Sequence, residues 1–315
     1  MKHAIKAMAA LACVCLAAAC ATSGAGAKGE KTPQYANVQI WEITRAETAY
    51  PDGMLSGIVT RAFDERGNQV SEETYSGTKA LVSRKSYSIG DDGAVSIVTS
   101  SDTGDVLGKA TRTTKDGLIV SEIQTNPKGE FETSEEYAYD DKGNKTRWTV
   151  KTASGNTMVT EYAYELGRPS AITIKDGTGA VVKKFVNVYP APKVPAADTA
   201  ATAGKAKAKD DAKAKAAAAK AALEAAQAAA NAKPEAEEEY DGSGALVSRT
   251  LLTWDGKFLT REEKKNAFGA TLSSTNYKND ANGNPVEITY LDRNGRVIEI
   301  KRQQWVSFTH QVLVR

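Results

Sequence analysis

A recurring turn signal constrains the fold of this chain more than any other feature. Eight times an Asp or Asn is followed three residues later by Gly, with strand-forming residues on each side. The Asp or Asn side chain can cap a type I turn, and Gly takes the left-handed conformation that closes it. Successive turn glycines from Gly104 to Gly179, and again from Gly244 to Gly295, lie 12 to 14 residues apart. The spacing predicts a long series of β-hairpins whose turns carry bulges.

The eight pairs are Asp64–Gly67, Asn126–Gly129, Asp140–Gly143, Asp176–Gly179, Asp241–Gly244, Asn266–Gly269, Asp280–Gly283 and Asp292–Gly295. Ser101–Gly104, Thr114–Gly117 and Thr253–Gly256 are weaker versions of the same signal.

Residues between the turns alternate between large apolar and polar types, which indicates strands with two different faces. The fold class predicted is all-β: a long antiparallel β-meander of repeated hairpins, about 16 to 18 strands, curled into an open sheet or partly closed barrel. One parity is expected to form a buried core. Its members are Tyr137, Tyr139, Trp148, Tyr162, Tyr164, Ile172 and Ile174. Thr133, Glu135, Thr160, Glu262 and Lys264 are expected on the same inward face.

The first twenty residues have the pattern of an export signal. Lys2 and Lys6 precede an apolar stretch, Ala7 to Leu16, that is too short to span a bilayer as a helix. Small residues then lead to Cys20, and this run resembles the lipobox of bacterial lipoproteins, with Ala17 where Leu is usual. The resemblance implies cleavage after residue 19, acylation of Cys20 and anchoring in the cell envelope. The alternative is an ordinary signal peptide and an exported protein without an anchor.

Residues 190–240 differ in composition from the rest. A Pro-rich piece precedes an Ala/Lys-rich low-complexity tract that ends at Pro234 and the acidic run Glu235 to Glu239. None of the 22 aromatic residues of the chain lies between residues 190 and 239. The tract has high helix propensity but no apolar stripe, so it is predicted to be a solvated, partly helical insertion.

The predicted organisation is a signal peptide at 1–19, a lipid-anchored tether at 20–34, a β-repeat block at 35–189, the insertion at 190–240 and a second β-repeat block at 241–315. Omitting the insertion leaves a spacing of 14 from Gly179 to Gly244, so the insertion is expected at a hairpin tip and both blocks in one sheet. Two separate sheets are the alternative.

Several turns extend the signal into a longer motif. Tyr137 to Asn144 reads Y-x-Y-D-x-x-G-N, and related segments begin at Tyr162, Tyr277 and Tyr290. This motif resembles the YD repeats of RHS-type and teneurin-type proteins, over roughly 57–189 and 240–301. The resemblance implies hairpins that join into a continuous curling sheet or shell.

Neither catalysis nor a cofactor or metal site is expected from the residues. All three cysteines, Cys13, Cys15 and Cys20, lie in the export segment, and His310 is the only His after residue 20. Nucleophilic triads and His/Cys zinc sites would therefore lack members. Once Lys2 and Lys6 are removed, 39 basic residues balance 39 acidic ones, which argues against a nucleic-acid partner.

The favoured function is a non-enzymatic, lipid-anchored envelope protein, at the outer membrane, whose β-repeat sheet is a binding or structural module. Its partners would be the membrane, through the lipid on Cys20, and a protein or envelope polymer. The alternative is a carrier whose curled sheet encloses an apolar ligand such as a lipid. A transmembrane barrel would need one continuously apolar face, which strands such as 257–266 lack.

Overall fold

The computed structural model describes residues 35–191, 220 and 223–313, in which 18 β-strands form one antiparallel sheet. The strands are β1 (Tyr35–Ala49), β2 (Leu55–Phe63), β3 (Gln69–Ser76), β4 (Leu81–Ile89), β5 (Val95–Ser101), β6 (Val106–Lys115), β7 (Leu118–Thr125), β8 (Phe131–Tyr139), β9 (Lys145–Thr152), β10 (Thr157–Glu165), β11 (Arg168–Asp176), β12 (Val181–Val188), β13 (Ala236–Asp241), β14 (Leu246–Asp255), β15 (Phe258–Asn266), β16 (Thr271–Asn279), β17 (Pro285–Asp292) and β18 (Val297–Leu313).

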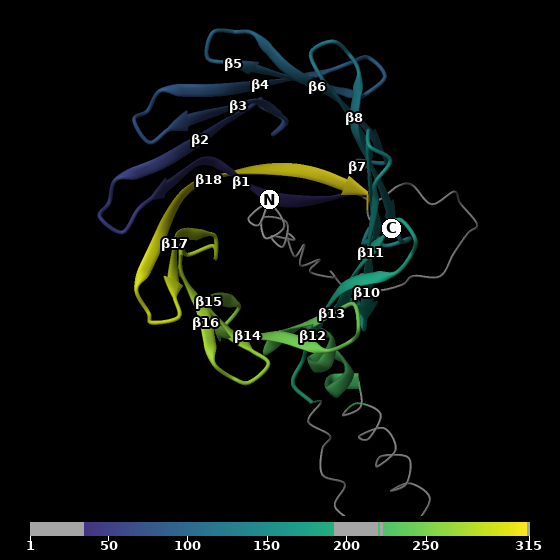
Figure 1. The fold of residues 1–315 in the computed structure, drawn as a ribbon. Helices are drawn as coiled ribbons and strands as arrows, with labels where there is room; N and C mark the ends of the chain where they lie inside the picture. Colours follow the sequence, from purple (N-terminus) through teal and green to yellow (C-terminus); the bar gives the residue numbers. More distant parts are fainter. Residues whose placement is uncertain (1–34, 192–219, 221–222, 314–315) are drawn as a thin grey trace, which may run out of the picture.

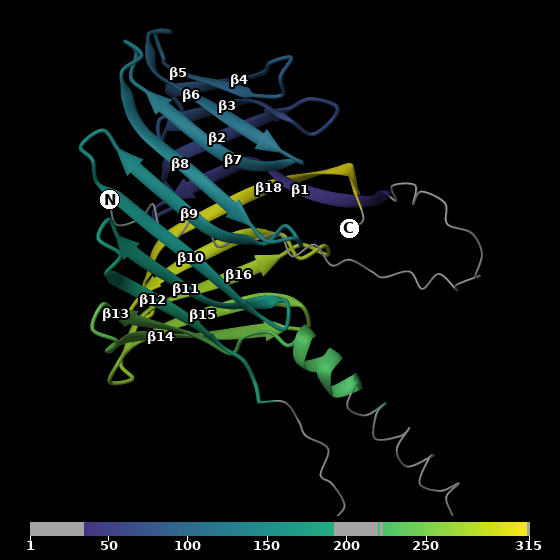
Figure 2. The same cartoon turned by 90° about the vertical axis from the view of Figure 1, so that its right-hand side faces the viewer.

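Each strand pairs with the next along the chain, and β18 returns to pair with β1, so the sheet closes into a barrel (Figures 1 and 2). The predicted all-β meander is confirmed, and its curl continues to full closure. Closure is possible because an even number of alternating strands makes the first and last antiparallel. The closing ladder extends from Tyr35 opposite Leu313 to Ala49 opposite Ile300.

The eight strong turn signals all form the predicted structure. In each, the Asp or Asn side chain accepts hydrogen bonds from the backbone N–H groups two and four residues later; Asp140 binds Lys142 and Asn144 at 3.0 and 2.8 Å. The closing glycine has positive φ, 81° at Gly143. The weaker Thr114–Gly117 signal is instead a two-residue loop, with Asp116 and Gly117 both at positive φ between the paired Lys115 and Leu118.

A second repeated contact, not predicted from the sequence, ties side chains eight or nine residues along each of six even-numbered strands to the backbone near the start of the preceding strand. Six side-chain donors at these positions bind a backbone carbonyl 19 or 20 residues earlier. The pairs are Tyr139 with Ile119, Tyr164 with Lys145, Tyr189 with Pro169, Trp254 with Pro234, Asn279 with Leu259 and Trp305 with Pro285.

The predicted end of the insertion is wrong. Residues 236–241, assigned to the insertion except for Asp241, form β13, which pairs with β12 and β14. The insertion therefore joins Val188 to Ala236, and the Glu235 N–H closes the hairpin on the Val188 carbonyl at 2.8 Å. Residues 223–231 are helical, as expected for a partly helical segment. The Ala229 carbonyl accepts a hydrogen bond from Arg168, so this end of the insertion contacts the barrel.

Different segments of the chain lie at the two ends of the barrel. The start of β1, the end of β18 and the insertion lie at one end, here called the insertion end (Figure 2). Every even-numbered strand begins at the opposite end. The predicted signal peptide, Cys20 and the tether lie outside the described residues.

Cross-strand register assigns each side chain to one of two faces. Arg61, Glu72 and Lys85 lie opposite one another on β2, β3 and β4 and share one face. The neighbouring residues Glu73 and Arg84 lie on the other face. The charges of Arg61 on β2 and Glu122 on β7 both shift the pKa of Tyr87 on β4. Side chains from strands this far apart can approach one another only on the concave side of the sheet. The face of Glu72 and Tyr87 therefore lines the lumen, and the face of Glu73 is outward.

The predicted core residues share this inward face, but they are half-buried rather than buried. The physical reason is barrel size, since a barrel of 16–18 strands is too wide for its side chains to fill. Among described residues, the buried hydrophobic side chains are only Ala46, Ala49, Ile58, Ile97, Val159, Ala236 and Ile288. The sheet is held mainly by its ladders, turns and polar contacts.

Candidate functional site on the lumen wall

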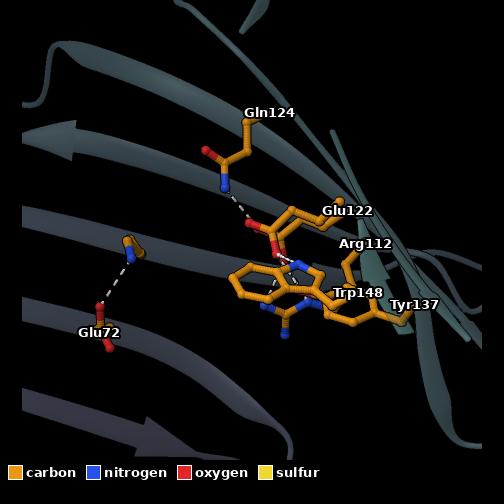
Figure 3. Close-up of polar contacts among 8 residues, drawn as sticks. Glu72, Arg112, Glu122, Gln124, Tyr137 and Trp148 are labelled. Atoms are coloured by element: carbon orange, nitrogen blue, oxygen red, sulfur yellow. Dashed lines mark hydrogen bonds and ion pairs between the residues drawn. The ribbon is translucent and has the colours of Figure 1, made fainter. Parts of the chain in front are cut away.

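The lumen wall between β2 and β9 carries a series of charged contacts (Figure 3). Glu72 on β3 bonds Arg61 on β2 at 2.8 Å and pairs with Lys85 on β4 at 3.2 Å. Three strands further, Glu122 on β7 binds Arg112 at 2.9 Å and accepts a hydrogen bond from Gln124 at 3.1 Å. Each carboxylate thus sits between cationic or amide donors on the same face.

Next to these contacts, Glu135 on β8 organises two aromatic rings. The Tyr137 hydroxyl donates to Glu135, and the Trp148 indole N–H donates to the same carboxylate at 3.0 Å. The two rings are nearly parallel, with centroids 6.4 Å apart, and the Lys145 ammonium lies 4.6 Å from the Tyr137 centroid. The register brings these residues together because Tyr137 lies opposite Trp148, and Glu135 is two residues before Tyr137.

Ionisation in this region follows from burial and these partners. Burial, and then the hydrogen bond to Glu135, raise the pKa of Tyr137, which keeps its hydroxyl protonated as a donor. Burial also lowers the pKa of Lys145. Burial works to raise the pKa of Glu72, but Lys85 and Arg61 outweigh it, so the pKa is lowered and the carboxylate stays charged.

A second cluster lies across β12 to β15. Glu239 on β13 contacts Lys183 at 2.5 Å, Lys264 at 2.7 Å and the Ser248 hydroxyl at 2.9 Å. Burial works to raise the pKa of Glu239, but the hydrogen bonds from Lys183, Lys264 and Ser248 outweigh it and lower the pKa to about 2. Tyr277, on the same wall, has a pKa raised by burial and by the charge of Glu262.

The wall remains accessible to water. The side chains of Arg61, Arg112 and Lys264 are 27% to 30% exposed although each faces the inside of the barrel. All four Trp residues of the chain, Trp41, Trp148, Trp254 and Trp305, lie on this face by register. The lumen therefore presents paired charges and aromatic rings to its contents.

The structure places the polar residues predicted for the inward face on that face. Thr133, Glu135 and Thr160 lie on the wall of β8 to β10, and Glu262 and Lys264 on the wall of β15. The charged series Arg61–Glu72–Lys85 and the Glu239 cluster were not predicted. The charged series could have been found by searching for oppositely charged residues that lie the same number of residues from successive turns. The Glu239 cluster could be found only once β13 was known to be a strand.

Cys20 and the side chain of His310 lie outside the part that can be described. Within the described ranges, no group of three His, Cys, Asp or Glu side chains is arranged to hold a metal ion. Among the same residues, no helix is both long enough and apolar enough to cross a membrane.

Comparisons with known proteins give only distant likenesses. No protein-family model and no curated protein matches the chain. The chain is similar to a crystal structure of a porin-like protein from Bacteroides uniformis, with 12% identity, a TM-score of 0.37 and coverage of 85% of this chain and 96% of that one. A porin-like protein from Bacteroides vulgatus gives 12% identity, a TM-score of 0.36 and coverage of 83% and 97%.

The crystal structure of TcdB2-TccC3-TEV is also similar, with 9% identity and a TM-score of 0.19, over 82% of this chain and 17% of that one. These likenesses are too distant to assign a function. The resemblance to YD repeats stays a prediction.

Proposed function

We propose that the protein is a non-catalytic module of the cell envelope that binds a hydrophilic polymer, such as a glycan strand, on its lumen wall. The observation that carries this proposal is the combination of aromatic rings with paired carboxylates and cations on one accessible inward face. Carboxylate, guanidinium and amide groups hydrogen-bond hydroxyl and amide groups, and aromatic rings offer flat apolar surface beside them.

The alternative of an apolar-ligand carrier fits this wall less well. Ligand cavities for apolar molecules are lined mainly by hydrophobic side chains, with few polar groups. Here Arg61, Glu72 and Lys85 lie on three successive strands of the lining. An apolar ligand would remove these charges from water without replacing their hydrogen bonds.

Envelope attachment through Cys20 is part of the proposal and rests on the sequence of the export segment. A Cys20→Ala variant is the form to use in solution experiments, because it removes the acylation site and the only Cys that follows the apolar stretch.

We expect soluble glycan strands, released from cell-wall peptidoglycan, to change the tryptophan fluorescence of the Cys20→Ala chain saturably. Glu72→Gln and Trp148→Ala should each weaken binding about tenfold, because each removes a charged or aromatic group from the wall. The matched control is Glu73→Gln, which removes the adjacent outward carboxylate and should leave binding unchanged. If the glycan leaves the fluorescence unchanged while an apolar fluorescent probe binds and is displaced by added lipid, the carrier function replaces this proposal.

A further inference from the structure

Exposed apolar side chains gather at the end of the barrel opposite the insertion. Of the 19 large hydrophobic residues that are exposed among those described, all but Val70, Ile89, Leu166 and Leu223 lie in the turns or strand ends there. Every even-numbered strand contributes at its start. We define the apolar rim by one residue from each: Met54, Val82, Leu107, Phe131, Met158, Val182, Val247, Leu272 and Ile298, which are 44% to 63% exposed.

Six of the nine rim residues come from a repeated irregularity of the ladder. At eight of the nine hairpins at this end, a register shift leaves one residue of the even strand without a partner. All eight of these extra residues are exposed, and six are aliphatic. They are Ser56, Val82, Leu107, Glu132, Val182, Val247, Leu272 and Ile298.

The insertion end supplies an internal comparison, because the same irregularity occurs there. Its extra residues are Val70, Val120, Thr146, Ser170, Thr260 and Val286, of which three are polar and only Val70 is exposed. The bulge itself thus accepts Ser or Thr. Backbone geometry therefore does not explain the exposed aliphatic residues of the rim.

Basic residues follow four of the rim residues on the outward face. Arg84, Lys109, Lys184 and Arg249 each lie two residues after a rim residue and are exposed. Lys109 and Lys184 take part in no ion pair within the described residues. Basic side chains thus lie behind the aliphatic residues on four of the nine even-numbered strands.

We infer that the apolar rim docks on an anionic phospholipid bilayer, with the barrel mouth facing the lipid. Two strand residues span about 7 Å, which matches the shallow depth of 5–10 Å at which apolar groups enter the headgroup boundary. The basic residues behind the rim would then lie at the level of anionic headgroups. Phe268, 95% exposed at the β15–β16 turn, extends the apolar surface beyond the rim.

A ring of different aliphatic residues fits a fluid surface better than a second copy. Rim-to-rim association of two chains would require packing complementarity around the whole circle, whereas lipid chains adapt to any outline. The chain enters β1, leaves β18 and departs into the insertion at the opposite end.

The test is sedimentation of residues 20–315 carrying Cys20→Ala, which lack the apolar export segment, with vesicles of phosphatidylcholine and phosphatidylglycerol. The rim variant changes six residues to the polar types that occur in the other bulges: Val82→Ser, Leu107→Ser, Val182→Thr, Val247→Thr, Leu272→Ser and Ile298→Thr. We expect its partition coefficient to fall by about tenfold or more. The matched control, Val70→Thr with Val120→Thr and Val286→Thr, should partition like the parent.

Two further variants test the same inference with fewer substitutions, in case the six changes impair folding. Phe268→Ser alters only an exposed turn and should weaken binding several-fold. Lys109→Gln with Lys184→Gln should weaken binding to anionic vesicles and leave binding to pure phosphatidylcholine unchanged. Absence of vesicle binding by the parent, or equal binding by the rim variant, overturns the inference. A concentration-dependent dimer that the rim variant abolishes, without vesicle binding, assigns the rim to a second copy instead.

Discussion

Deleting residues 190–240 should destroy the barrel, whereas replacing residues 190–234 by a short turn should preserve it. The longer deletion removes β13, leaving one strand fewer than the present 18. All later strands would then run in the opposite direction, and β18 would lie parallel to β1. The antiparallel ladder that closes the sheet could not form.

The replacement variant carries the five residues of the Asp140–Asn144 turn in place of 190–234, between the facing residues Tyr189 and Glu235. It should keep a cooperative thermal transition and lose about 1 kcal/mol of stability, because Arg168 loses its hydrogen bond to the Ala229 carbonyl. The longer deletion should give an aggregating chain without a cooperative transition. Equal stability of the two variants would show that β13 is dispensable and that closure has been misassigned.

Glu239→Gln should destabilise the barrel by about 2 kcal/mol near neutral pH, because it leaves Lys183 and Lys264 without their shared carboxylate. The measurement is urea unfolding of the parent and the variant. The matched control is Glu136→Gln, whose carboxylate lies on the outward face of β8, 3.2 Å from Lys151, with both side chains at least half exposed. An exposed pair of this kind contributes little, so the control should change stability by less than about 0.5 kcal/mol.

The pH dependence gives the same substitution a second readout. The pKa of Glu239 is about 2 in the folded barrel, below the ordinary value of 4.5. Its stabilisation is therefore fully present above pH 4.5 and is lost as the pH falls toward 2. The difference in unfolding free energy between parent and variant should shrink over that window. A difference that stays constant down to pH 2 would mean that the substitution perturbs packing rather than charge.

The turns and the strand alternation could be predicted because both are local. An Asp or Asn three residues before Gly specifies its turn through its own side chain, as Asp140 and Asp280 do, and needs no distant partner. The sharing of one face by Tyr137, Trp148 and Tyr162 likewise follows from alternation. Whether that face is a filled core or an open wall depends on strand number and closure, which no single segment encodes.

Strand β13 could not be recognised from its own residues. Its sequence, Ala236 to Asp241, is acidic, continues the polarity of the insertion and has low strand propensity. It becomes a strand because basic residues on neighbouring strands lie beside its carboxylates, as Lys183 and Lys264 do for Glu239. The spacing of 14 residues between Gly179 and Gly244 after removal of the insertion concealed the missing strand.

Cysteine labelling tests most directly whether the lumen is open and whether its wall binds the ligand. Thr99→Cys, introduced into residues 20–315 carrying Cys20→Ala, which contain no other Cys, places a thiol on the inward face between Lys85 and Gly108, and Ser96→Cys places one outside. Both should react with a small maleimide in the folded protein, and bound glycan should slow labelling of the inward thiol alone. A thiol at position 99 that reacts only after unfolding, or at a rate that glycan does not change, would contradict an open lumen whose wall binds the ligand.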